Sequence, residues 1–216
     1  MNKNRIQFCF HDLKKNNRSA LIAFITAGDP NYTSSLKLMN AMPKAGVDII
    51  ELGIPFSDPM ADGPVIQRSY LRALKNGSTL EKTLRLVSNF RKKNNYTPIV
   101  LMGYFNPIYQ MGTKKFFKLA KLSGVDGVLI VDLPPESSED LYKNLKNSEI
   151  DLIRLTTPTT DNNRMNKINK VSSGFLYYVS ITGITGSKIN KLSEIKRSYI
   201  KLKKKTNLPF VIGFGI

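Results

Sequence analysis

Seven short apolar runs rich in strand-forming residues recur along the 216-residue chain, and helical patterns separate them. The runs occupy residues 21–27, 47–53, 98–104, 126–132, 151–157, 174–180 and 208–214. Because strands and helices alternate, we expect a parallel sheet. Continuous apolar stretches such as residues 127–131 are typical of strands that are covered on both faces. The pattern leaves two architectures open, a doubly wound sheet and a (β/α)8 barrel.

Helical signals fill the segments between these runs. Ser78 and Glu81 have the spacing of a capping box, which predicts a helix that begins at Ser78. The apolar stripe of this helix consists of Leu80, Leu84 and Val87. Such crossover helices are the usual connection between neighbouring parallel strands.

A further helix is predicted before the first run. Its apolar residues follow the spacing i, i+3, i+4, i+7 and are Ile6, Cys9, Phe10 and Leu13. We interpret Cys9 as a small buried apolar residue, and the helix could cover the amino-terminal end of a barrel. No linker rich in proline, glycine or serine divides the chain. We therefore expect a single domain over residues 1–216.

The chain is strongly basic, with 33 Lys and Arg residues against 16 Asp and Glu residues and a formal net charge of +17. Such a charge indicates a site for nucleic acid or another anion only where the basic residues converge on one face. On a helical wheel of residues 113–124 the lysines share one arc, away from the phenylalanines. Residues 190–205 repeat this separation. We interpret the charge as a coat on outer helices, and a non-catalytic module that binds RNA or another anion is the alternative.

The composition excludes several kinds of site. Cys9 is the only cysteine and His11 the only histidine, so an internal disulfide, a Cys/His zinc cluster and a histidine relay are ruled out. Acid–base chemistry must then rest on carboxylates, tyrosines or lysines. No stretch approaches the roughly 18 to 20 uncharged apolar residues of a membrane helix, and residues 1–15 lack the apolar run of a signal peptide. We expect a soluble, intracellular protein without a membrane or nucleic-acid partner.

The densest functional signal lies in residues 47–64. Strand alternation places Ile49 and Glu51 on one face, so that Glu51 is a carboxylate at the carboxyl end of a buried strand. That end carries the active site in barrels, and apolar surroundings raise a carboxyl pKa, which suits a group that donates and accepts a proton. Asp58 and Asp62 follow in a loop whose shape prolines and glycines fix. The alternative is that these aspartates are turn residues and that Glu51 is held in an ion pair.

Two later segments, residues 182–187 and 213–216, have the character of anion sites. They follow the sixth run and end the seventh, and their glycines allow backbone N–H groups to approach a phosphate. These glycines are Gly183, Gly186, Gly213 and Gly215. The same glycines also suit ordinary turns.

Several segments, in this order, resemble the tryptophan synthase alpha chain family. They are residues 23–30, 48–67, 102–109, 124–134, 177–186 and 211–216. The segment Glu-Leu-Gly-Ile-Pro-Phe-Ser-Asp-Pro-Met-Ala-Asp-Gly-Pro at 51–64 is highly specific. The resemblance implies a (β/α)8 barrel. It also implies the retro-aldol cleavage of indole-3-glycerol phosphate to indole and glyceraldehyde 3-phosphate, whereas another phosphate-binding barrel lyase or isomerase is a closer alternative than an RNA-binding module.

The resemblance also implies roles for individual residues. Glu51 matches the catalytic glutamate, which shuttles a proton, and Asp62 matches the catalytic aspartate, which accepts a hydrogen bond from the indole nitrogen. Asp58 lies where the family's contact loop with its partner subunit falls. The positions that match substrate-binding residues are Phe24, Tyr104, Leu129, Tyr177, Thr185, Gly186, Phe214 and Gly215.

By the same resemblance, the chain itself needs no cofactor and no metal. Its expected partner is a tryptophan synthase beta chain that holds pyridoxal phosphate and receives the indole, in an alpha2beta2 heterotetramer. We expect the protein in the cytoplasm or the plastid stroma, because a composition rich in Lys and Asn without a transit peptide suits a plastid genome.

The family continues beyond the segment that residues 211–216 match, through an eighth strand and a Gly-Ser turn at the phosphate site. About 250 residues are typical of a barrel. We therefore expect this sequence to be C-terminally incomplete, covering about seven strands and the N-terminal helix and lacking the final strand and its helices.

Overall fold

The computed structural model describes residues 4–137, 139–146, 148–179 and 192–213. Within these ranges, seven parallel strands pair in the order of the chain. They are β1 (Ile22–Thr26), β2 (Ile49–Gly53), β3 (Ile99–Gly103), β4 (Gly127–Ile130), β5 (Asp151–Thr156), β6 (Leu176–Val179) and β7 (Phe210–Gly213). Each strand lies inside one predicted run. A doubly wound fold requires a reversal of strand order, which this sheet lacks, and the arrangement is that of a barrel.

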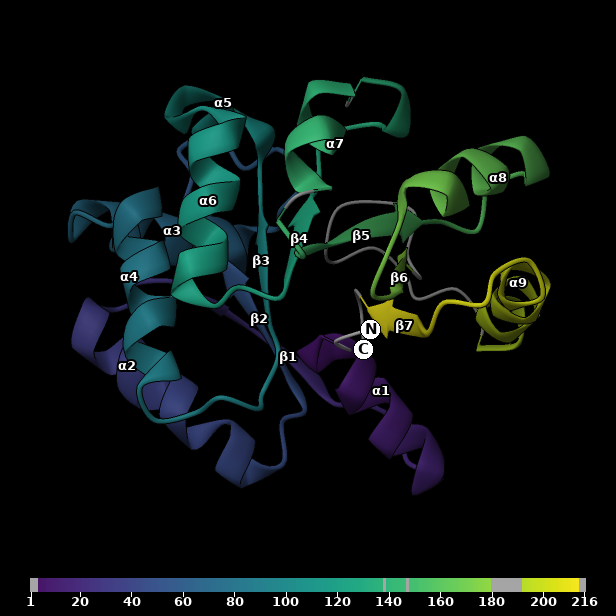
Figure 1. Ribbon diagram of the computed structural model, residues 1–216, viewed down its shortest axis with the longest axis horizontal. Helices are drawn as coiled ribbons and strands as arrows, with labels where there is room; N and C mark the ends of the chain where they lie inside the picture. The colour runs from purple at the N-terminus through teal and green to yellow at the C-terminus, as the bar shows by residue number, and fades with distance from the viewer. Residues whose placement is uncertain (1–3, 138, 147, 180–191, 214–216) are drawn as a thin grey trace.

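Helices flank this curved sheet, on its outer side in every case but α1, which lies at one end (Figure 1). They are α1 (Arg5–Lys15), α2 (Tyr32–Ala41), α3 (Pro64–Lys75), α4 (Leu80–Arg91), α5 (Phe105–Met111), α6 (Thr113–Ser123), α7 (Glu139–Leu145), α8 (Asn162–Val171) and α9 (Leu192–Lys203). Two short 3-10 helices, η1 (Pro43–Ala45) and η2 (Pro135–Ser137), complete the connections. In the described part of the chain, no helix has the length and apolar character needed to cross a lipid bilayer.

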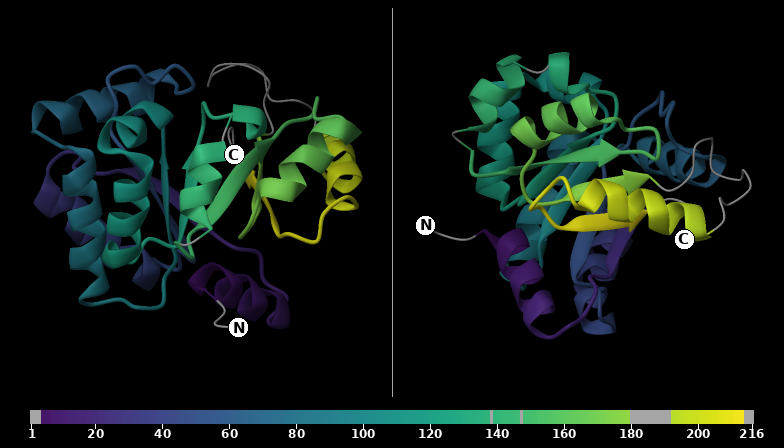
Figure 2. Two further views of the ribbon diagram at one scale, coloured as in Figure 1. Left: turned by 45° about the horizontal axis from the view of Figure 1, so that its top comes forward. Right: turned by 90° about the vertical axis from the view of Figure 1, so that its right-hand side faces the viewer.

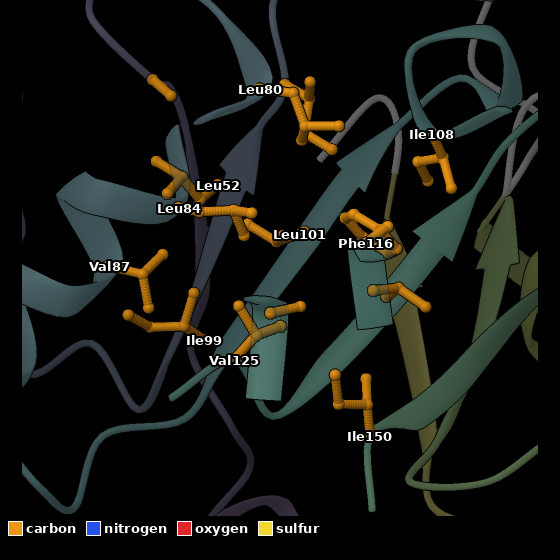
Figure 3. Packing of buried hydrophobic residues seen from close by; sticks show 14 of the residues in the cluster. Leu52, Leu80, Leu84, Val87, Ile99, Leu101, Ile108, Phe116, Val125 and Ile150 are labelled. Atoms are coloured by element: carbon orange, nitrogen blue, oxygen red, sulfur yellow. The ribbon is translucent and has the colours of Figure 1, made fainter. Parts of the chain in front are cut away.

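Alternate residues of the strands face the inner and the outer side of the sheet, where the outer residues of β6 and β7 form an apolar cluster of their own. Ile50 and Leu52 belong to the outer layer between the sheet and its helices, part of which Figure 3 shows. Ile49 belongs to the inner layer, which the concave side of the sheet encloses together with Val100 and Leu129. This confirms the predicted alternation along β2, and it places the intervening Glu51 on the inner side.

Helix α1 lies at the amino-terminal end of the strands (Figure 2). Ile6 is fully buried in the inner layer, and Cys9 packs against the same layer while staying half-buried. Asn4 donates a 2.6 Å hydrogen bond to the carboxylate of Asp151, the first residue of β5. Burial is the main cause that raises the pKa of Cys9, to about 11. The predicted helix is therefore confirmed, and it covers the end of the barrel opposite the carboxyl ends of the strands.

The predicted start of α4 is wrong by one residue. The N-cap is Thr79, whose hydroxyl accepts a 3.2 Å hydrogen bond from the N–H of Lys82. Ser78 instead belongs to the turn that closes α3, because its N–H donates to the carbonyl of Ala73 after the left-handed residue Gly77. The capping-box spacing was therefore a coincidence of two adjacent hydroxyl residues.

Helix α6 has the two faces that the wheel predicts. Phe116, Phe117 and Ala120 are buried, whereas its lysines are exposed, namely Lys114, Lys115, Lys118 and Lys121. In α9, Leu202 is likewise buried. Lysines on these two helices therefore coat the outside of the barrel, as expected from the sequence.

Candidate active site

Glu51 is the central residue of β2, rather than lying at the carboxyl end of the strand as predicted, and it is 3 % exposed. Its neighbours in register are Phe24 on β1 and Val100 on β3. Its Oε1 atom has no hydrogen-bond partner, and no ion pair of Glu51 occurs among the described residues. Because burial penalises the charged form, the pKa of Glu51 is raised to about 7. The alternative of a structural ion pair at Glu51 finds no support in this part of the chain.

Asp62 ends the loop that joins β2 to α3, and it is 8 % exposed. The loop is held from both sides, since Asp62 donates its N–H to the carbonyl of Pro59 and accepts a 2.8 Å hydrogen bond at its own carbonyl from Gln67. Burial raises the pKa of the Asp62 carboxyl, and a hydrogen bond from Tyr104 acts in the opposite direction. Asp62 is thus a fixed carboxylate and more than a turn residue.

Tyr104 joins this loop to the end of β3. Its hydroxyl donates a 2.7 Å hydrogen bond to Oδ2 of Asp62 and accepts a 2.9 Å hydrogen bond from the N–H of Ala61. Its ring lies 5.3 Å from that of Phe56, centroid to centroid. The phenol is fully buried, and burial is the main cause that raises its pKa. Tyr104 therefore stays protonated and acts as a permanent hydrogen-bond donor to Asp62.

Two residues of the site escape the sequence analysis, Tyr70 and Gly53. The buried phenol of Tyr70 comes from α3, and its pKa is raised by burial first and then by the charges of Asp62, Tyr104 and Glu51. A Cβ atom on Gly53 would lie 2.5 Å from the ring of Phe24 and 3.2 Å from the hydroxyl of Tyr70. A buried tyrosine on a helix stripe has the pattern of a core residue, so no local signal separates Tyr70 from the core.

Three further predicted site residues share the inner layer with Glu51. Leu129 on β4 and Tyr177 on β6 are buried, and Phe24 on β1 is partly buried. The pKa of Tyr177 is raised chiefly by burial and secondarily by the charge of Glu51. The structure therefore brings an aromatic and aliphatic wall to the same side of the sheet as the unpaired carboxyl group.

The remaining predicted residues stand apart. Asp58 is exposed, and its carboxylate accepts a 2.7 Å hydrogen bond from the hydroxyl of Ser57, so it does not join the two buried carboxyl groups. Four predicted substrate-binding residues lie outside the described residues: Thr185, Gly186, Phe214 and Gly215. No group of three or more His, Cys, Asp or Glu side chains in the described ranges could hold a metal ion.

The site thus contains two carboxyl groups in different environments. Glu51, with a pKa near the physiological range, is able to take up and release a proton, whereas Asp62 is held by a phenol. The model of a protein family described as the tryptophan synthase alpha chain matches residues 10–216. The chain belongs to the tryptophan synthase alpha chain family. Members of this family are lyases that act as the alpha subunit in tryptophan biosynthesis, which confirms the activity class expected from the resemblance.

Solved structures of this family share the fold. Tryptophan synthase subunit alpha from Legionella pneumophila str. Paris is 43% identical, with a TM-score of 0.93, and the match covers 99% of this chain and 79% of that one. The tryptophan synthase alpha2beta2 complex from Pyrococcus furiosus contains a chain that is 40% identical, with a TM-score of 0.84, and the match covers 91% of this chain and 79% of that one. A chain of tryptophan synthase from M. tuberculosis is 28% identical, with a TM-score of 0.88, and the match covers 99% of this chain and 82% of that one. The seven strands and their helices therefore match the TIM barrel of the solved alpha-chain structures.

Proposed function

We propose that Glu51 and Asp62 are the catalytic pair with which this chain cleaves indole-3-glycerol phosphate into indole and glyceraldehyde 3-phosphate. The observation that carries the proposal is the buried carboxyl group of Glu51 on the inner side of β2, whose Oε1 atom has no hydrogen-bond partner among the described residues. A buried carboxyl group without a partner lowers the stability of the fold, so its retention indicates a chemical role.

The reaction breaks the bond between indole C3 and the adjacent glycerol carbon. A proton is added at C3, the glycerol hydroxyl loses its proton, and the electrons of the broken bond return to the indole ring as the aldehyde forms. Glu51 exchanges protons near neutral pH and is the group we assign to this transfer. Asp62, oriented by Tyr104, accepts a hydrogen bond from the indole N–H and stabilises positive charge on the ring.

We propose that the inner layer binds the indole and glycerol portions of the substrate. Phe24, Leu129 and Tyr177 present apolar surface beside Glu51. Tyr104 fixes the carboxylate of Asp62. Aromatic and aliphatic walls with a few polar groups are the usual environment for a flat heteroaromatic ligand. The phosphate-binding residues that the resemblance assigns are Gly186, Phe214 and Gly215, and Thr185 matches the closing loop after the sixth strand.

We propose the beta chain as the partner, in an alpha2beta2 assembly in which the beta chain holds pyridoxal phosphate. The loop that contains Asp58 presents an exposed apolar side chain, Met60, which is 79 % exposed. Exposed apolar residues beside a charge are common in protein interfaces. An Asp58→Ala variant is expected to lose stimulation by the beta chain, measured as the ratio of indole release with and without that chain. The compartment that we propose is the cytoplasm or the plastid stroma.

The direct test is an indole-release assay with indole-3-glycerol phosphate. The Asp62→Asn variant should lower kcat by at least about a hundredfold, because the amide cannot stabilise the ring cation as a carboxylate does. Asp12→Asn on the exposed face of α1 serves as the matched control and should keep the activity of the parent protein. Absence of indole release by the parent protein, or full activity of Asp62→Asn, would overturn the proposal.

A further inference from the structure

Asp132 connects two neighbouring strands at the carboxyl end of the barrel. It follows β4, and its Oδ1 atom accepts a 2.8 Å hydrogen bond from the N–H of Phe105, the first residue of α5. Phe105 comes directly after Tyr104, the phenol that holds Asp62. An exposed acidic residue after a strand has the pattern of an ordinary turn residue, so the sequence alone does not distinguish it.

The backbone on both sides of Asp132 is anchored. The N–H of Val131 donates a 3.0 Å hydrogen bond to the carbonyl of Gly103 in β3. The carbonyl of Leu133 accepts a hydrogen bond from the buried guanidinium of Arg154 in β5. Because its two neighbours are tied to different strands, the Asp132 carboxylate is a fixed point to which the start of α5 is attached.

Tyr104 transmits that attachment to the proposed site. Its side chain is fully buried, and its hydroxyl is engaged with both Ala61 and Asp62 at 2.9 and 2.7 Å. The ring also packs on Phe56. A buried side chain with these restraints has no free space in which to compensate for a displaced backbone, so movement at the start of α5 displaces the hydroxyl relative to Asp62.

We propose that Asp132 is a positioning residue for the lyase reaction, acting through Phe105 and Tyr104 to hold Asp62 in its working orientation. The inference rests on the proposed function, because it requires that Asp62 takes part in the reaction. The contact joins β4 to β3 and then, through Tyr104, to the loop after β2. Four successive strands, including β5 through Arg154, therefore support the orientation of one carboxylate.

The test compares three variants in the indole-release assay. Asp132→Ala removes the acceptor and should lower kcat about tenfold with little change in KM, since misplacement of a catalytic group affects the reaction step more than substrate binding. Asp132→Asn keeps an acceptor oxygen and should restore kcat to within about threefold of the parent protein. Asp161→Ala is the matched control, because Asp161 accepts a 2.7 Å hydrogen bond from the N–H of Arg164 at the start of α8 and makes no contact with Asp62.

A double-variant cycle separates positioning from a general loss of stability. If Asp132 acts through Tyr104, adding Asp132→Ala to Tyr104→Phe should lower kcat by no more than about twofold further, whereas independent effects would multiply. Unchanged kcat in Asp132→Ala, or multiplied effects in the cycle, would overturn the inference. Should Asp132→Ala fail to fold, Asp132→Ser takes its place in the cycle with Tyr104→Phe. Its kcat is then compared with that of Asp132→Asn, and the same outcomes support or overturn the inference. Full activity of Asp62→Asn would instead refute the proposed function itself.

Discussion

A methyl group added at Gly213 would lie 2.0 Å from the hydroxyl oxygen of Tyr177 and 2.3 Å from its Cζ atom. Tyr177 lies in β6 and Gly213 ends β7, the neighbouring strand, and both are buried. The phenol therefore occupies the space that a side chain at position 213 would need. This wall of the proposed substrate site depends on a glycine for a reason of space and not of backbone conformation.

Gly213→Ala should lower kcat/KM by about tenfold or more, because the added methyl group displaces Tyr177 from the proposed wall of the substrate site, and overpacking should also lower the stability of the fold by about 1 to 3 kcal/mol. Replacement of Tyr177 by a smaller residue should relieve the collision. The Gly213→Ala/Tyr177→Leu protein is therefore expected to release indole faster than Gly213→Ala alone. An alanine variant with parental activity, or a double variant slower than the alanine variant, would contradict this view of the wall.

Tyr104→Phe should shift the acid limb of the rate profile to higher pH. The hydrogen bond from Tyr104 lowers the pKa of Asp62 against the effect of burial, so its loss raises that pKa and a higher pH is needed to ionise the carboxyl group. The measurement is kcat against pH for the alpha chain alone. Tyr109→Phe, at an exposed position of α5, the helix that follows Tyr104, is the matched control and should keep the parental profile. An unshifted acid limb in Tyr104→Phe would show that Asp62 does not set it.

Arg91→Met should lower the free energy of unfolding by about 3 kcal/mol, because it leaves the buried carboxylate of Asp126 with one fewer cation. The guanidinium of Arg91 lies 2.6 Å from Asp126, with side chains 8 % and 3 % exposed. The exposed pair of Arg72 with Asp29 is the control, and Arg72→Met should cost less than about 1 kcal/mol. Denaturant titration measures both values. Equal losses would mean that burial does not determine the contribution of these pairs.

The unpaired Glu51 should make stability depend on pH. Its pKa is raised from 4.5 to about 7 in the folded state, so between these values the folded protein binds more protons than the unfolded chain. The free energy of unfolding should therefore fall as pH rises through this interval, by about 3 kcal/mol from this group. Glu51→Gln should lack that fall, and Glu81→Gln on the exposed side of α4 should keep it. Parallel pH dependences for the parent protein and Glu51→Gln would contradict the buried, unpaired carboxyl group.

The parts of the fold that local patterns specify were predictable from the sequence. Each strand is a run of apolar residues long enough to be buried on both faces, and the alternation of Ile49, Ile50 and Glu51 assigns each side chain to a layer. The choice between a barrel and a doubly wound sheet depends on which strands pair. Strand pairing is a long-range property, and only the resemblance to a family indicated it.

The site was predictable in its residue types but not in its connections. Glu51 stands out because a carboxyl group in an apolar strand is unusual, whereas Asp62 was assigned by the resemblance of its segment to a known family. The hydrogen bond of Tyr104 to Asp62 joins residues 42 positions apart, and the phenol of Tyr70 reaches the site from α3. Neither relation leaves a local pattern. The cap of α4 has a local cause instead, because Ser78 and Thr79 offer equal side-chain chemistry and the left-handed turn at Gly77 that closes α3 selects between them.

The measurement that tests the central claim most directly is the single-turnover rate of indole release by Glu51→Gln, together with its affinity for indole-3-glycerol phosphate. Glutamine keeps the size of the side chain and removes the exchangeable proton. We expect the rate to fall by about a hundredfold to ten-thousandfold, the usual contribution of a general acid–base group, while the dissociation constant stays within about threefold of the parental value. A Glu51→Gln protein that releases indole at a rate near that of the parent protein would contradict the assignment of Glu51 as the proton-transferring group.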